Sequence, residues 1–454
     1  MLSLTINKMK KNIICSLILT ASMLVARSES FRDWATQDYM TGNWSGIRNQ
    51  LATNGIALEF FYIGSNPNNL SGGIKTGSIY QGALFMSMDV DSQKLLGYSG
   101  GTFHVSGEWL NGQKPFSDRY IGDYNHVNLV DFGNSSRVLE LYYQQRFFED
   151  KLSIKAGELS IDSDFISPVY YSTFGDFTLL NQTFFFPSLP YGLFSLPYLP
   201  KTKQGLSTSP YSTPGAVVKV KISENLAFQV GSYSGSPDQE NGVQFNLNQA
   251  NGLLTFAEIG YQVNPGTNSP GLGGSYKLGG YYDTTTYPDS YGSIYYVSGL
   301  SATLPTHHGN YGGYILAEQQ LYLENGKADP ARQGLLGFFR GLAAPSDRNL
   351  TELELDGGLV YRGLIPTRDW DSLAVAYSYL QFSHDIRNAQ MEINQMAPGT
   401  FVPVDAEQLV EVSYKIQATA WWTIQPSFQW VIHPGGSSAI PNSCAFILQT
   451  TLRF

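Results

Sequence analysis

Three carboxylates stand close together in the first half of the sequence. Glu158, Asp162 and Asp164 lie within seven residues, just before a segment rich in Phe, Tyr and Pro. Paired carboxylates can serve as the acid and base of a glycosidase. Carboxylates also accept hydrogen bonds from sugar hydroxyls, and aromatic rings can stack on the apolar face of a pyranose. The plainer alternative is a set of ordinary charges that face water and do no more than order it.

Other patterns with catalytic potential are weak. Gly97-Tyr98-Ser99-Gly100-Gly101 fits the G-x-S-x-G elbow of serine hydrolases, but antiparallel strands are expected on both sides of it and no helix follows. The segment therefore predicts a turn that uses glycines for positive φ. The six histidines are scattered, without the spacing of a metal site. We therefore expect no enzyme, no metal and no cofactor, and keep a hydrolase embedded in a barrel as the less favoured alternative.

The elements that must position these side chains are strands. Apolar and polar residues alternate from about residue 56 to the end of the chain, most clearly over 410–419. There, one face carries Val410, Val412, Tyr414, Ile416 and Ala418, and the other carries Glu411, Ser413, Lys415, Gln417 and Thr419. A polar face so rich in charged groups and amides favours water on one side of the sheet and lipid on the other. A soluble sandwich, which stacks its apolar faces, is the alternative.

Composition and length favour a membrane barrel. Charged residues make up 14% of the chain, well below the roughly 25% of soluble domains. After residue 30, no apolar run reaches the length of about 20 residues that a spanning helix needs. At roughly 25 residues per strand and connection, the chain can hold about 16 to 18 strands. Barrels of this size enclose an aqueous channel. The prediction is an all-β protein, a transmembrane antiparallel β-barrel of about 16 strands.

The two ends of the sequence suggest the compartment. Lys8, Lys10 and Lys11 precede an apolar stretch at 13–26, which predicts a secretory signal over residues 1–30 and a barrel domain over 31–454. The segment Ala445 to Phe454 alternates and ends on an aromatic residue, as expected for a closing strand that the barrel-assembly machinery recognises. These features predict the outer membrane of a Gram-negative-type bacterium, with lipid and lipopolysaccharide around the barrel.

Two further features limit the partners. The net charge of −9 argues against nucleic acid, which requires a basic surface. Without the signal, Cys444 is the single cysteine, so no disulfide within the chain is expected. The sequence does not distinguish a homotrimer from a monomer, because an apolar interface and a lipid-facing surface look alike.

Residues 162–215 interrupt the alternation with recurring aromatic residues and prolines. A stretch of this length without strands is usually functional. Two readings of residues 165–214 stay open: an inward-folded segment that constricts the channel, or a cap packed outside the barrel.

From about residue 40 to 454, the sequence resembles the carbohydrate-selective porin family, OprB. The stretches that carry the resemblance are Asn43 to Arg48, Leu51 to Ile56, Lys94 to Ser106, Leu139 to Tyr142, Ala156 to Phe165, Tyr276 to Tyr282, Ala344 to Asn349, Gly358 to Pro366 and Gln425 to Gly436. The resemblance implies a 16-stranded outer-membrane barrel that passes small sugars, glucose above all, by diffusion into the periplasm. The segment at 170–210 is richer in Phe and Pro than we expect for the family, which bears on the substrate.

The resemblance also implies a channel that is narrowed by an inward-folded constriction segment and lined by acidic, basic and aromatic residues. The positions in this chain are Glu59, Glu108, Glu140, Tyr142, Lys155, Glu158, Asp162 and Asp164. The alternative functions are a general or organic-anion-selective porin of the same fold, an enzyme embedded in the barrel, and a barrel with a structural role. The acidic balance of the chain disfavours anions as solutes.

Overall fold

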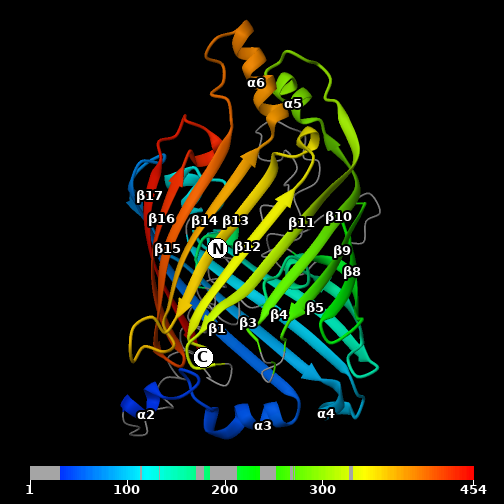
Figure 1. Cartoon of the computed structure of the whole chain (residues 1–454), viewed down its shortest axis with the longest axis vertical. Helices are drawn as coiled ribbons and strands as arrows, with labels where there is room; N and C mark the ends of the chain where they lie inside the picture. Colours follow the sequence, from blue (N-terminus) through cyan, green and yellow to red (C-terminus); the bar gives the residue numbers. More distant parts are fainter. Residues whose placement is uncertain are drawn as a thin grey trace, which may run out of the picture.

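The computed structural model describes residues 31–112, 115–131, 133–169, 178–184, 212–235, 252–265, 269, 271–326 and 331–454. The strands of these residues form one antiparallel sheet that closes on itself, because β1 pairs with both β3 and β17 (Figure 1). In the described part of the chain, sixteen full strands are joined by a two-residue stub, β2 (Gly77–Ser78). The predicted barrel of about 16 strands is confirmed, while the predicted signal at 1–30 lies outside the described residues.

The full strands follow one another around the barrel in chain order. They are β1 (Ile56–Ser71), β3 (Gln81–Asp91), β4 (Gly101–Gly112), β5 (Ser135–Phe147), β6 (Leu152–Leu159), β7 (Thr213–Lys221), β8 (Leu226–Ser234), β9 (Leu253–Val263), β10 (Gly274–Pro288), β11 (Thr306–Leu323), β12 (Gly334–Ala343), β13 (Thr351–Arg362), β14 (Ser372–Phe382), β15 (Ala406–Thr419), β16 (Trp422–Ile432) and β17 (Ser443–Arg453).

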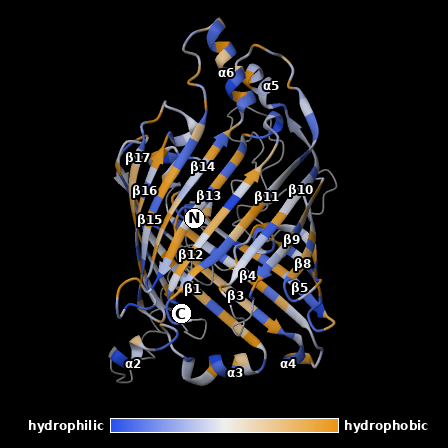
Figure 2. Cartoon of the chain, viewed as in Figure 1, coloured by the Kyte–Doolittle hydropathy of each residue, from blue (hydrophilic) through white to orange (hydrophobic). Residues whose placement is uncertain are grey.

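The period-2 pattern places most polar side chains of the strands inside the barrel and exposed apolar ones outside. On β15, Glu411 and Ser413 are fully buried, whereas Val412 between them is 42% exposed. Hydrophobic and hydrophilic residues alternate in this way along the strands (Figure 2). The exposed apolar residues form the surface that lipid would cover, and the buried polar residues face the interior.

The two ends of the barrel differ in their connections. Short connections such as 148–151 lie at the end that carries α2 (Phe31–Ala35), α3 (Ile47–Thr53) and α4 (Ser92–Leu96) (Figure 1). The opposite end carries longer connections with α5 (Ser290–Val297) and α6 (His384–Met396). Because outer-membrane barrels have short periplasmic turns and longer outer loops, the end with α5 and α6 is the extracellular one. Among the described helices, none has the length and hydrophobicity to cross a membrane.

The G-x-S-x-G segment is a turn at the periplasmic end, as predicted. It connects α4 to β4, and both Gly97 (φ 76°) and Gly100 (φ 80°) adopt the left-handed conformation that glycine favours. No strand-to-helix elbow is present at these residues, because an antiparallel strand follows the serine.

Part of the interior is filled by chain segments that fold in from the extracellular end. Leu179, Leu180 and Phe184 belong to a buried cluster that also contains inward-facing residues of β15 and β17, such as Leu409 and Ile447. The described residues 160–169 and 178–184, called here the inner segment, therefore lie within the barrel. Of the two readings of residues 165–214, this placement favours the inward one for 165–169 and 178–184. The remaining aromatic residues of that stretch, at 170–177 and 185–211, lie outside the described residues.

Residues that precede β1 pack against the periplasmic end of the barrel at the seam, the place where β1 pairs with β17. The rings of Trp34 and Trp421 lie 4.4 Å apart, and the Trp421 indole N–H donates to the Trp34 carbonyl oxygen at 3.2 Å. Arg48 donates from Nη2 to the Phe454 carbonyl oxygen at 2.5 Å and lies over the rings of Tyr39 and Trp44. These contacts, called here the seam clasp, join the start of the barrel to its last strand.

Replacing Trp34 with alanine should lower the thermal stability of the folded barrel. The substitution removes an indole that covers the buried Trp421 ring, a loss of about 1–3 kcal/mol for the buried area and the ring pair together. The measurement is the temperature at which the heat-modifiable folded band disappears in detergent electrophoresis. Trp370→Ala is the matched control, because Trp370 is 52% exposed. Equal midpoints for the two variants would contradict a stabilising role of the seam clasp.

Candidate functional site

A continuous row of polar and aromatic side chains crosses the inner wall formed by β3 to β6. Asp89 and His104 are 2.7 Å apart, and the His104 ring stacks on Tyr142 at 4.7 Å. Lys155 Nζ lies 4.7 Å from the Tyr142 ring centroid and 2.5 Å from Asp164 Oδ2. The structure thus brings together three of the predicted residues, Tyr142, Lys155 and Asp164. The five residues named in this paragraph are called here the wall row: Asp89, His104, Tyr142, Lys155 and Asp164.

The Tyr142 ring has two neighbours within the wall row, the stacked His104 ring and the Lys155 ammonium. Because these neighbours cover part of the ring, its hydroxyl is the group most open to a solute. No described residue hydrogen-bonds to the Tyr142 hydroxyl. A solute hydroxyl can take that position, with the Lys155–Asp164 pair next to it.

Two other predicted residues are buried in the same wall but have structural partners. Glu108 lies 2.9 Å from Arg137 Nε, and both side chains are almost fully buried. Glu140 accepts a hydrogen bond from the Ser160 backbone N–H at 3.1 Å, at the start of the inner segment. These two carboxylates hold the wall and the inner segment, and their oxygens are only partly available to solutes.

The remaining predicted residues lie apart from the wall row. Glu59 is exposed near the periplasmic end, 3.4 Å from Arg453. Asp162 accepts a short hydrogen bond from the Ser160 hydroxyl within the inner segment. Glu158 is buried. In the strand register it pairs with Leu141, so the alternation along β6 assigns Glu158 and Lys155 to different faces of the strand. The structure therefore does not join Glu158, Asp162 and Asp164 into one carboxylate cluster.

Three carboxylates on other strands hold the inner segment by its backbone. Glu258 on β9 accepts from the Ile166 N–H at 3.1 Å, and Glu318 on β11 accepts from the Val169 N–H at 2.7 Å. Glu411 on β15 accepts from two successive N–H groups, those of Leu180 and Asn181, at 2.6 and 2.9 Å. We call Glu258, Glu318 and Glu411 the wall carboxylates. The sequence places Glu411 on the polar face of its strand, but it does not single out any of the three as a site residue.

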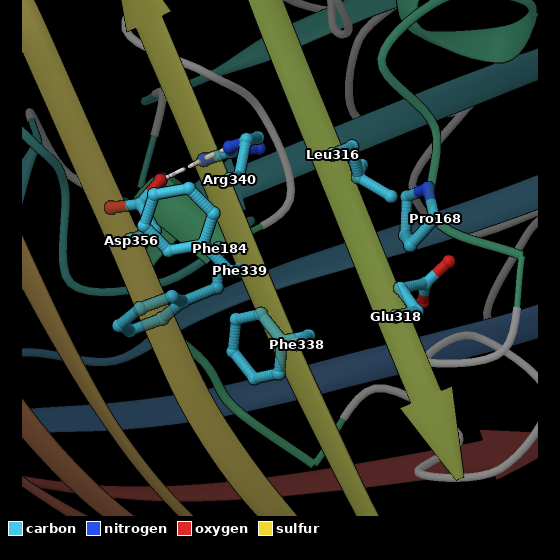
Figure 3. A pocket seen from close by; sticks show the side chains of 8 residues that line it. All are labelled: Pro168, Phe184, Leu316, Glu318, Phe338, Phe339, Arg340 and Asp356. Atoms are coloured by element: carbon cyan, nitrogen blue, oxygen red, sulfur yellow. Dashed lines mark hydrogen bonds and ion pairs between the residues drawn. The ribbon is translucent and has the colours of Figure 1, made fainter. Parts of the chain in front are cut away.

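A buried cluster of Arg340 with two carboxylates holds the end of the inner segment against β12 and β13. Arg340 Nε donates to Asp356 at 3.0 Å, and Nη2 lies 3.3 Å from Glu354. Arg340 also donates a short hydrogen bond to the Thr183 carbonyl oxygen, while the Thr183 hydroxyl donates to Glu354 at 2.9 Å. Figure 3 shows Arg340 pointing toward Asp356, with the Phe184 ring beside this pair. One buried guanidinium therefore serves two buried carboxylates and the backbone.

A second loop, between β4 and β5, is held in the same way. Asp131 accepts from the Ser117 N–H at 2.9 Å, and Glu407 on β15 accepts from the N–H groups of Tyr124 and Asn125 at 2.8 and 3.3 Å. Burial, followed by repulsion from Glu407 and Asp131, raises the pKa of Asp123 in this loop well above its ordinary value. Both inward segments thus rest on carboxylates that accept backbone N–H groups.

The sequence also matches a known family over most of its length. The profile of the carbohydrate-selective porin family, OprB, matches residues 75–454. The chain belongs to the OprB family. Porin B of Pseudomonas aeruginosa is similar to it, with 26% identity over 427 residues that cover 89% of each chain.

Solved structures show the same fold. The high-pH structure of Pseudomonas putida OprB has a TM-score of 0.77 and 22% identity, covering 94% of this chain and 100% of that one. The low-pH structure of the same protein has a TM-score of 0.55 and 18% identity, covering 92% and 99%. At these identities the likeness concerns the fold alone.

Family membership and fold together make this OprB-family chain a sugar-transporting porin of the Gram-negative outer membrane, a channel rather than an enzyme. The wall row and the inner segment lie inside that channel. From the sequence, the residues that hold the inner segment can be recognised only as polar residues at inward-facing positions. Their backbone partners belong to a loop that can lie more than a hundred residues away in the chain.

Proposed function

We propose that this OprB-family channel passes monosaccharides of the glucose type into the periplasm by diffusion, and that the wall row forms its sugar-binding surface. The observation that carries the proposal is the inward-facing Tyr142 side chain beside the Lys155–Asp164 pair, which joins the wall strand β6 to the docked inner segment. Sugar hydroxyls both donate and accept hydrogen bonds, and this group of side chains offers both. Weak binding suits a channel, since the solute must also leave.

The experiment that tests the proposal is a glucose titration of single-channel conductance in a planar bilayer. The purified chain should form a channel whose current falls as glucose is added to the solution. A channel whose current is indifferent to glucose and other monosaccharides would refute the proposed substrate class.

Replacing Tyr142 with phenylalanine should weaken the block by glucose. The variant keeps the stacked ring but removes the hydroxyl, which is worth about 0.5–1.5 kcal/mol as one hydrogen bond. The half-blocking glucose concentration should therefore rise by about threefold to tenfold. Tyr143→Phe is the matched control, because Tyr143 is the neighbouring tyrosine on the lipid-facing side and is 41% exposed. If both variants respond alike, the wall row is not the binding surface.

The remaining predicted residues are given other roles in this proposal. We propose that Glu59, at the periplasmic end, is a charge of the channel mouth, and that Glu108, Glu140, Glu158 and Asp162 act mainly by holding structure. We also propose that residues 1–30 direct export and are removed, which leaves 31–454 as the barrel domain. N-terminal sequencing of the protein from outer membranes tests that boundary.

A further inference from the structure

A small polar cavity lies on the periplasmic side of the inner segment, near that end of the channel. It has a volume of about 130 Å³ and is lined by residues of β7 to β10 and by the turn between β7 and β8, with Val169 of the inner segment at its edge. The cationic residues of its described lining are Lys219 and Lys221 on β7 and Lys277 on β10. We call this cavity the lysine cavity.

Lys219 and Lys221 face the interior of the barrel. In the strand register Lys219 lies opposite Gln229, which is buried, whereas their neighbours Val218 and Val220 are 40% and 38% exposed on the lipid side. Both lysines are exposed. Among the residues that the structure describes, neither ammonium group has an ion-pair partner. Both ammonium groups are therefore accessible to a solute in the water-filled channel.

The main carboxylate of the lysine cavity is already fully engaged. Glu258 lies 3.4 Å from Lys277 Nζ and accepts hydrogen bonds from the Tyr314 hydroxyl at 2.8 Å and the Gln229 amide at 3.0 Å. It also accepts the Ile166 N–H that docks the inner segment. The other carboxylate of the lining, Glu224, is exposed in the turn. In the described part of the lining, three lysines against two glutamates leave a charge of +1, in a chain whose net charge is −9.

The shape and chemistry of the lysine cavity suit an anionic group rather than a sugar ring. Among the residues that the structure describes, its lining contains no aromatic side chain that could stack on a pyranose. A volume of about 130 Å³ is below the roughly 300 Å³ of pockets that enclose a whole small molecule. It has room for a carboxylate group while the rest of the solute stays in the channel.

We propose that the lysine cavity binds the carboxylate of sugar acids, so that the channel passes polyhydroxy carboxylates as well as neutral sugars. The solute first meets the wall row and the inner segment, and its carboxylate then binds between Lys219 and Lys221 before release to the periplasm. The inference rests on the proposed function and names a second substrate class for the same channel. The acidic balance of the whole chain does not oppose it, because a solute responds to the charges within reach of the channel water.

The test compares glucuronate with glucose, which share the pyranose ring and differ by a carboxylate. Half-blocking concentrations of both are measured by single-channel recording on the full-length protein and on Lys219→Gln/Lys221→Gln. Exposed ion pairs are weak and the variant removes two charges, so the ratio of the glucuronate to the glucose half-blocking concentration should rise by about twofold to thirtyfold. The difference should shrink at high salt, since screening weakens exposed charges.

The matched control is Lys75→Gln/Lys94→Gln, which removes two exposed lysines that do not line the cavity. Its ratio should equal that of the unmodified protein. An equal change in both double variants, or no change in either, overturns the inference while a glucose block still supports the proposed function. A channel that neither solute blocks refutes the proposed function itself.

Discussion

Replacing Glu411 with alanine should enlarge the conductance of the channel and weaken its block by glucose. Glu411 is fully buried and accepts the Leu180 and Asn181 N–H groups, at 2.6 and 2.9 Å. Each buried N–H that loses its acceptor costs about 1–3 kcal/mol, so the docked position of the inner segment should weaken by about 2–6 kcal/mol. A segment released from β15 leaves more of the lumen open to ions.

The measurement is single-channel conductance together with glucose titration, on protein that still migrates as a folded barrel. Glu411→Gln should lie between the unmodified protein and the alanine variant, because an amide oxygen keeps one acceptor. Glu324→Ala serves as the control, since Glu324 is exposed in the connection after β11. A folded alanine variant with unchanged conductance would show that Glu411 does not position the inner segment.

Replacing Arg340 with alanine should have the largest effect on stability. Arg340 is buried with Glu354 and Asp356, at 3.3 and 2.5 Å, and both carboxylates are almost completely shielded from solvent. Removal of one partner from a buried ion pair leaves an uncompensated charge and costs about 3–5 kcal/mol. The folded barrel should therefore form in lower yield and unfold at lower temperature in detergent electrophoresis.

A compensated variant separates lost charge pairing from lost packing. In Arg340→Met/Glu354→Gln/Asp356→Asn the unpaired charges are gone, so most of the stability should return. Arg387→Ala is the control, because the Arg387–Asp405 pair is about half exposed and should contribute about 0–1 kcal/mol. If the triple variant is no more stable than Arg340→Ala, electrostatic compensation is not the role of this cluster.

The alternation of side chains predicts the barrel, its inward face and much of the wall, since residue parity within a strand assigns each side chain to lumen or lipid. The same parity assigns Lys155 and Glu158 to different faces of β6, although the two residues lie close together in the sequence. Parity does not reveal what an inward carboxylate binds. Glu411 and the Leu180 N–H are 231 residues apart, and their contact depends on how a long loop returns through the barrel.

The composition of residues 162–215 predicts a functional segment, and the described parts at 160–169 and 178–184 lie inside the barrel as the inward alternative requires. The anchoring of this segment by backbone N–H groups leaves no trace in its own sequence, because every residue except proline carries the same donor. Only the acceptors on the strands are residue-specific. They are dispersed over β9, β11 and β15.

The seam clasp has a consequence for the order in which the chain folds. Its partners, Trp34 with Trp421 and Arg48 with Phe454, are separated by 387 and 406 residues. Contacts at such separations carry the largest loop-closure entropy and depend on the intervening strands being in place. They should therefore form last, when β17 reaches β1. Fluorescence from the Trp34–Trp421 pair would then report completion of the barrel, distinct from the earlier appearance of strands.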